Sequence, residues 1–136
     1  MRISDILKKK KTFSFEVFPP NPEQSKISDI YGTIDSLQQY DPDFISVTFK
    51  SSGNYSQNTI DLASYIQSNS NAEPLVHFTC GALDNHDVDQ LITTLQQAKL
   101  ENILALRGDR PTDFEGNYLQ YFKHASELME YLRERG

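Results

Sequence analysis

The residues best suited to chemistry stand within or directly after short apolar segments. Glu16 lies between Phe15 and Val17, His77 lies in the apolar segment 75–79, and Arg107-Gly108-Asp109 follows the apolar run 102–106. A carboxylate and an imidazole can move protons, and a guanidinium can bind an anion. If these segments are neighbouring parallel strands, their carboxyl ends meet at one rim, where ligands bind in α/β proteins. The sequence therefore predicts one site assembled from several strand ends.

Glu16 is the candidate general acid. A carboxyl group held among aromatic side chains keeps its proton more readily than one in water, and this suits general-acid work. Pro19 and Pro20 follow it closely and should hold the next loop rigid. The alternative is a buried ion pair between Glu16 and a lysine or arginine. The position of Glu16 does not by itself choose between the two.

His77 and Cys80 have simpler structural readings. A single histidine in a strand is more often a hydrogen-bonded core residue than a ligand. No second His or Cys stands at a spacing suited to a metal site, so no metal is expected. Cys80 could serve as a nucleophile, but no histidine is paired with it, and a small buried residue is the better interpretation.

Arg107-Gly108-Asp109 has the composition of an anion-binding turn. Arg107 offers a planar fork of donors for a phosphate or carboxylate, and Gly108 allows the backbone to approach a ligand closely. In the structural alternative, Asp109 caps a turn or pairs with Arg107. The chain has no Gly-x-Gly-x-x-Gly motif and no Gly-Lys-Ser phosphate loop, so a conventional dinucleotide or nucleoside-triphosphate site is not indicated.

Residue periodicity predicts the elements that position these groups. Strands are expected at 12–18, 44–49, 74–79 and 102–106, and helices at 1–10, 23–40, 59–67, 88–98 and 119–133. Because a helix lies in each connection, the strands should be parallel. The run 102–106 is nearly all apolar, as in a strand covered on both faces. Residues 1–136 read as a single α/β domain, and periodicity alone leaves open either an open sheet or half a barrel.

Composition excludes several functional classes. The chain has 136 residues, about one domain, whereas a complete (β/α)8 barrel needs about 250. A net charge of -6 gives no basic face for nucleic acid, and the lysine run 8–11 reads as a solvated helix end. No apolar run approaches the roughly 20 residues of a membrane span. One cysteine cannot build a disulfide framework, so a cytoplasmic protein is expected.

Four segments of the chain resemble the motifs of methylenetetrahydrofolate reductases. They are Phe13–Pro20, with a glutamate before two prolines; Phe44–Phe49, with Ser-Val-Thr-aromatic; His77–Cys80; and Asn102–Asp109, which ends Leu-Arg-Gly-Asp. Each motif is weak when taken singly. All four occur in the order and at the spacing of the family, and together they cover essentially the whole chain.

The resemblance implies a fold and an activity. The chain would form the first four βα units of a (β/α)8 TIM barrel, which is a half-barrel. The family reduces 5,10-methylenetetrahydrofolate to 5-methyltetrahydrofolate in one-carbon and methionine metabolism. It uses FAD, with NADH or NADPH as the electron donor, and no fingerprint in this chain selects between the two nicotinamides.

The resemblance also implies roles for individual residues. Glu16 would be the general acid that helps open the folate ring to an iminium ion. Asp109 would lie near flavin and folate, where its charge stabilises that cation. The implied cofactor contacts are Thr48, Phe49, Ser51, His77, Arg107, Gly108, Asp109, His124 and Ala125.

The chain departs from the family pattern at Lys50 and Ser51, where glycine and alanine are usual, and at His124, where tyrosine is common. It ends at Gly136, before the strands that carry further flavin and folate contacts in the family. The first alternative is therefore a truncated, inactive half-barrel that binds flavin or a partner chain. Its two open sheet edges would permit a homo-oligomer. The second alternative is a small α/β ligand-binding module that shares only the strand-end pattern.

Overall fold

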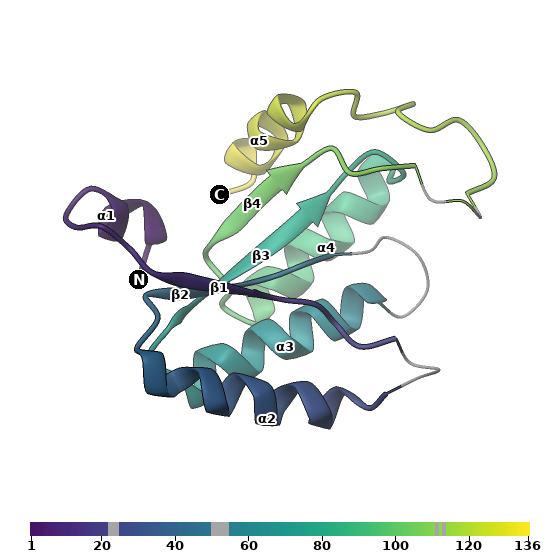
Figure 1. The fold of residues 1–136 in the computed structure, drawn as a ribbon. Coiled ribbons are helices and arrows are strands. Elements are labelled where there is room, and N and C mark those ends of the chain that lie inside the picture. The colour runs from purple at the N-terminus through teal and green to yellow at the C-terminus, as the bar shows by residue number, and fades with distance from the viewer. Residues whose placement is uncertain (22–24, 50–54, 111, 113) are drawn as a thin grey trace.

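The computed structural model describes residues 1–136 apart from 22–24, 50–54, 111 and 113. Helices and strands alternate along the chain (Figure 1). The strands are β1 (Ser14–Val17), β2 (Phe44–Val47), β3 (Glu73–Thr79) and β4 (Ile103–Leu106). The helices are α1 (Ile3–Leu7), α2 (Ile27–Leu37), a short 3-10 helix η1 (Gln38–Tyr40), α3 (Tyr55–Asn69), α4 (Asn85–Gln97) and α5 (Ala125–Glu134). Every strand lies within two residues of its expected bounds.

The strands form one parallel sheet in the order β1-β2-β3-β4. Each new strand is therefore added on the same side of the previous one. A doubly wound sheet would reverse this order at a switch point and carry helices on both faces. Here α2, α3 and α4 lie on the same side of the sheet (Figure 1). The order and the single helical layer are those of consecutive barrel units, and the predicted fold class is confirmed.

The hydrophobic core lies between the sheet and its helices. Alternate strand residues point toward the helices because side chains in a strand alternate between its faces. Ile45, Val47 and Phe78 are almost completely buried in this layer. Burial of each such side chain stabilises the folded state by roughly 1.5–3 kcal/mol relative to leaving it exposed to water. Ile66 of α3 and Leu128 of α5 complete the same core.

Within the described part of the chain, no helix covers the opposite face of the sheet (Figure 1). The expectation that β4 is covered on both faces was wrong, because Leu104 is 41% exposed and belongs to this open face. Ile103 and Ala105 pack against the helical core instead. An apolar run reports that a strand is largely buried, but it does not say what covers each face. The open face is where polar side chains of the strands emerge.

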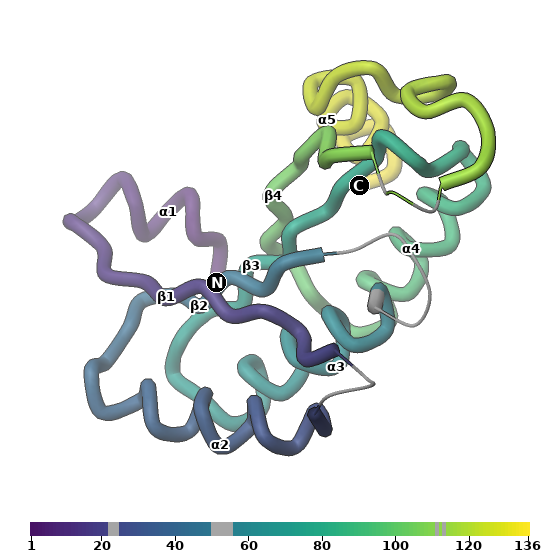
Figure 2. Tube along the Cα trace, turned by 45° about the vertical axis from the view of Figure 1, so that its right-hand side comes forward, coloured from purple at the N-terminus to yellow at the C-terminus, as the bar shows by residue number. Residues whose placement is uncertain are grey.

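The first helix is shorter than the predicted helix at 1–10 and lies at the amino-terminal end of the sheet. Figures 1 and 2 place α1 at the end opposite to the loops that follow the strands. Asn102, just before β4, accepts a hydrogen bond from Ile3 N and donates one to Met1 O. Ile3 is buried, whereas Leu7, expected on the same side, is 55% exposed. The helix therefore closes one end of the sheet and leaves the carboxyl ends free.

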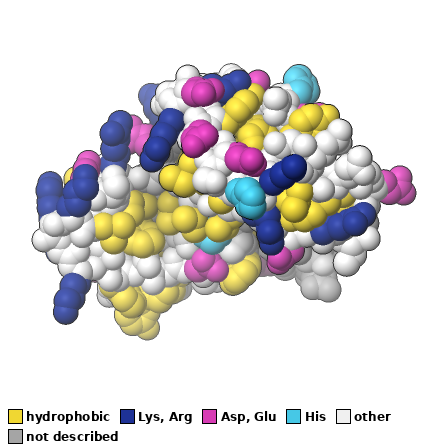
Figure 3. Space-filling view, turned by 90° about the horizontal axis from the view of Figure 1, so that it is seen from above, with side chains coloured by type: hydrophobic (Ala, Val, Ile, Leu, Met, Phe, Trp, Pro, Cys, Tyr) yellow, Lys and Arg dark blue, Asp and Glu magenta, His cyan; other side chains and the backbone are white. Residues whose placement is uncertain are grey.

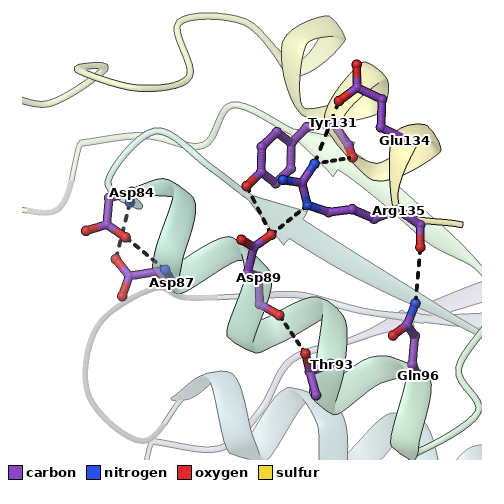
Figure 4. Close-up of polar contacts among 8 residues, drawn as sticks. All are labelled: Asp84, Asp87, Asp89, Thr93, Gln96, Tyr131, Glu134 and Arg135. Carbon is purple, nitrogen blue, oxygen red and sulfur yellow. Dashed lines mark hydrogen bonds and ion pairs between the residues drawn. The ribbon is translucent and has the colours of Figure 1, made fainter.

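The predicted helices at 59–67 and 119–133 had wrong boundaries. The helix α3 is longer at both ends, and α5 begins only at Ala125. Leu119 has a left-handed φ of 63° and the N-cap His124 is extended, and a helix can contain neither conformation. Arg135 Nε and the Tyr131 hydroxyl both donate to Asp89 Oδ1, at 2.7 and 3.0 Å (Figure 4). These bonds tie α5 to α4.

The carboxyl ends of β3 and β4 are held together by the segment that precedes α5. The Tyr118 hydroxyl donates to Gly108 O, and the Tyr118 ring lies where a Cβ on Gly81 would stand. Gly81 N donates to Arg107 O at 2.8 Å, and Leu119 N donates to Gly81 O at 2.8 Å. Gly108 has a φ of +79°, which favours glycine. The backbone of Arg107 and Gly108 is thus fixed before any ligand binds.

Asp43 fixes the start of β1 against the start of β2. Its carboxylate forms an ion pair with Lys10 and accepts a hydrogen bond from Phe13 N at 3.0 Å. The Lys10 hydrogen bond, and then the Phe13 hydrogen bond, hold the pKa of Asp43 below its usual range. A carboxyl group whose pKa is lowered by folding stabilises the folded state when it is ionised.

We expect the stability that Asp43 contributes to be present above about pH 4 and to be lost as the pH falls through its lower folded pKa. Asp43→Asn should lower the free energy of unfolding at pH 7 and flatten its decline between pH 5 and 2. Urea unfolding across this range measures both effects. Asp41→Asn is the control, because Asp41 is exposed and asparagine tolerates its left-handed φ of 49°. Equal pH dependence in the wild type and Asp43→Asn would contradict this account.

Gly108→Ala should destabilise the fold. The new Cβ would lie 2.8 Å from Thr79 Cβ, and the left-handed conformation alone costs about 1–2 kcal/mol. Gly32→Ala is the matched control, because nothing lies within 4 Å of its new Cβ and alanine favours a helix interior by up to about 1 kcal/mol. The midpoints of chemical unfolding should move in opposite directions. A Gly108→Ala variant as stable as the wild type would show that this turn is not constrained.

Candidate functional site

Three polar side chains from neighbouring strands meet on the open face of the sheet. Glu16 of β1 stands directly opposite Ser46 of β2 in the parallel register. Leu75 is the β3 partner of Ser46, and His77 follows two residues later on the same face. Glu16 Oε2 lies 3.3 Å from Ser46 Oγ and 3.4 Å from His77 Nε2. The structure thus brings together the carboxylate and the imidazole that the sequence predicted at one rim.

Glu16 is more exposed than expected. Its side chain is 48% exposed, whereas that of His77 is only 12% exposed, and Ser46 is buried. The expectation of a carboxylate buried among aromatic rings was wrong, because Phe15 and Val17 point toward the helices while Glu16 points the other way. The neighbour of Glu16 is a histidine, rather than the lysine or arginine of the alternative ion pair. A carboxyl group placed this way can exchange a proton with a molecule on the open face.

Viewed from the side away from α2 and α3, hydrophobic side chains form a broad band with histidine and acidic side chains beside it (Figure 3). Leu104 on the open face of β4 is one exposed apolar side chain. An apolar surface with a few polar groups is typical of sites for small organic ligands.

Thr48 follows β2 on the same face as Ser46. Its backbone N–H donates to Val17 O at 3.1 Å, and its carbonyl accepts from the Thr59 hydroxyl at 2.8 Å. Phe49 stacks on the buried ring of Phe78, with ring centroids 5.8 Å apart, and so anchors the end of β2 in the core. Ser51 lies outside the described residues.

Arg107 and Asp109 are exposed at the end of β4. Among the residues that the structure describes, neither side chain forms an ion pair, so the predicted alternative of an Arg107–Asp109 pair is not present. Their backbone is held by the Gly81 and Tyr118 contacts described above. A fixed backbone with free charged side chains suits the binding of a charged ligand.

His124 and Ala125 lie at the start of α5. Glu127 Oε2 accepts hydrogen bonds from Lys123 N at 2.6 Å and from His124 N at 3.0 Å. The hydrogen bond from His124 N, and then that from Lys123 N, lower the pKa of Glu127. The helix therefore supplies its own carboxylate to its first turn.

Cys80 is completely buried at the end of β3, and burial raises the pKa of its thiol. A raised pKa disfavours the nucleophilic thiolate, so the prediction of a small buried residue is confirmed. The described part of the chain holds no cluster of three or more His, Cys, Asp or Glu side chains suited to a metal ion. No helix among the described residues is long and apolar enough to cross a membrane.

Ser46 is the residue whose contact the sequence did not reveal. Its signal was a single hydroxyl inside the otherwise apolar segment Phe44–Val47. Recognising the contact requires the register between β1 and β2, which periodicity does not supply.

Comparison with known proteins identifies the family. The family model described as methylenetetrahydrofolate reductase matches residues 2–136. Methylenetetrahydrofolate reductase 1 of Schizosaccharomyces pombe is 33% identical over 142 residues, which cover 98% of this chain and 23% of that protein. Methylenetetrahydrofolate reductase (NADH) 1 of Arabidopsis thaliana is 30% identical, over 90% of this chain and 21% of its own.

The bacterial relatives are shorter. The 5,10-methylenetetrahydrofolate reductase of Escherichia coli is 28% identical over 89% of this chain and 39% of its own length. The chain thus spans about a fifth of its eukaryotic relatives and about two fifths of this bacterial one. With its sequence matched from residue 2 to residue 136 and its four parallel βα units in barrel order, the chain belongs to the methylenetetrahydrofolate reductase family.

Proposed function

We propose that this chain carries the first four βα units of an enzyme that reduces 5,10-methylenetetrahydrofolate to 5-methyltetrahydrofolate, with FAD as cofactor and NADH or NADPH as electron donor. The observation that carries the proposal is the Glu16 carboxylate on the open face of the sheet, 3.4 Å from His77 Nε2. The reaction needs a proton donor, and this carboxyl group is one. The names of the relatives, all methylenetetrahydrofolate reductases, support the same substrate.

Glu16 is the general acid in this proposal. Its proton passes to a nitrogen of the five-membered folate ring, the bond from that nitrogen to the methylene carbon breaks, and its electron pair stays on the nitrogen. The carbon that remains is part of an iminium cation. Asp109, exposed and without an ion pair in the described chain, places a negative charge near that cation and lowers its free energy.

The residues at the strand ends fit a flavin dinucleotide. FAD, when bound, supplies hydride transfer between nicotinamide and folate. Arg107 offers an unpaired guanidinium to the diphosphate. Gly108 keeps the adjacent backbone accessible to the cofactor. The Nε2 atom of His77 faces Glu16, and its Nδ1 atom is the one proposed to contact the flavin. Thr48, Phe49, Ser51, His124 and Ala125 complete the proposed contacts.

The start of α5 contributes less to the diphosphate than a free helix terminus would. Glu127 already accepts the amide hydrogens of Lys123 and His124. We therefore assign the contribution of His124 to its side chain.

Residues 1–136 act as one domain in this proposal, the amino-terminal part of the barrel. A buried free cysteine suits a reducing compartment, and we place the protein in the cytoplasm.

The test uses the purified protein that contains this chain. We expect it to be yellow or to take up added FAD, and the flavin absorbance should bleach under anaerobic NADH or NADPH. Added methylenetetrahydrofolate should then reoxidise the flavin. Glu16→Gln should slow that second step by roughly 10²–10⁴-fold while leaving bleaching unchanged.

Glu101→Gln is the control, because it makes the same change in an exposed residue just before β4, at the other end of the sheet. It should leave both steps unchanged. Unimpeded folate reduction by Glu16→Gln would remove Glu16 from the mechanism. A colourless protein that takes up no FAD would favour the alternative of an inactive half-barrel.

A further inference from the structure

The two oxygens of the Glu16 carboxyl group have different surroundings. Ser46 Oγ lies 3.3 Å from Oε2, and His77 Nε2 lies 3.4 Å from the same atom. Among the described residues, no hydrogen bond or ion pair engages Oε1. The two donors come from β2 and β3, so they approach Oε2 from strands on the same side of β1.

We propose that Ser46 and His77 are positioning residues that hold Oε2 of Glu16, so that Oε1 is the oxygen that transfers the proton to the substrate. This inference rests on the proposed function for its substrate. A protonated carboxyl group has one acceptor oxygen and one oxygen that carries the proton. Because the Ser46 hydroxyl donates to Oε2 and His77 Nε2 faces the same atom, Oε2 is the acceptor oxygen and Oε1 carries the proton.

Ser46 and His77, which hold Glu16 Oε2, have little freedom to move because both belong to strands of the sheet. Ser46 is 6% exposed, and its hydroxyl also lies 3.4 Å from Phe15 O, so both neighbours of its proton belong to β1. The His77 side chain is 12% exposed. The buried Ser46 and the partly buried His77 therefore limit how far the Glu16 side chain can turn, although nearly half of that side chain is exposed.

The distances from Ser46 and His77 to Oε2 leave room for both contacts to shorten. The 3.3 Å hydrogen bond from Ser46 and the 3.4 Å approach of His77 Nε2 are longer than the common 2.7–3.0 Å of hydrogen bonds between such groups. Catalytic hydrogen bonds are often long without substrate and shorten when the substrate excludes water. When the proton leaves Oε1, the O–H bond breaks, an N–H bond forms on the folate, and the carboxylate charge is shared with Oε2, where both donors stabilise it.

The first test is spectroscopic and needs no turnover. In histidine-labelled protein, ¹⁵N NMR should show His77 as the tautomer protonated on Nε2. Glu16→Ala should convert the signal to that of an imidazole averaging between tautomers. Ser14→Ala, two residues before Glu16 on the same face, should leave it unchanged. A His77 signal that does not respond to Glu16→Ala would overturn the proposal that His77 holds Glu16 Oε2.

The second test separates the two half-reactions. Ser46→Ala should slow reoxidation of the flavin by folate on the order of 10-fold, less than complete loss of the acid. Reduction of the flavin by nicotinamide should stay within about twofold, because it requires no proton from Glu16. Ser46→Thr should restore the rate, since it keeps the hydroxyl, and Ser14→Ala should match the wild type.

The outcomes distinguish this inference from the proposed function. If the wild type reduces its flavin and the folate, and Ser46→Ala does so equally fast, the positioning role is overturned and the function stands. If Ser46→Ala slows both half-reactions equally, its role is structural and the inference is again overturned. If the wild type reduces no folate, the proposed function falls, and the assignment of Oε1 as proton donor falls with it.

Discussion

The alternation of side chains in the parallel sheet is the constraint on which the site depends. Each strand sends every second side chain into the helical layer, and burial of residues such as Ile45, Val47 and Phe78 fixes which set that is. The remaining set must emerge on the open face. Because the register pairs Glu16 with Ser46, the same burial that stabilises the fold places these polar groups beside each other. A shift of one residue in β1 would send Glu16 into the core.

At the carboxyl ends of β3 and β4, the backbone is held in place while two charged side chains extend from it. The Gly81, Gly108 and Tyr118 contacts hold the ends of β3 and β4, while Arg107 and Asp109 extend from that rigid frame without ion pairs in the described chain. Glu16 shows the same division within one side chain, since Oε2 is engaged and Oε1 is not. Preorganised groups of this kind need little rearrangement when charge develops in a reaction.

The strands were predictable because a two-residue period and short apolar runs are local signals. Their order in the sheet was expected only from the family resemblance, because periodicity left open either an open sheet or half a barrel. The start of α5 was not predictable. The chain before it takes non-helical conformations at Leu119 and His124, and Tyr118 in the same segment docks against Gly81, which is a tertiary contact. For the site, the sequence supplied Glu16, His77 and Arg107 as strand-end groups. It could not supply the Glu16–Ser46–His77 contacts, or the exposure of Glu16, because both follow from register and from which face the helices cover.

In the proposed mechanism, Glu16 presents a proton from the open face of the sheet to the folate ring. A structure of the protein with FAD and a stable analogue of 5,10-methylenetetrahydrofolate tests it most directly. We expect Glu16 Oε1 to lie within about 3 Å of a nitrogen of the five-membered ring, with Oε2 still facing Ser46 and His77. A folate ring bound away from Glu16, or one approached by Oε2 with the Ser46 and His77 contacts broken, would contradict it.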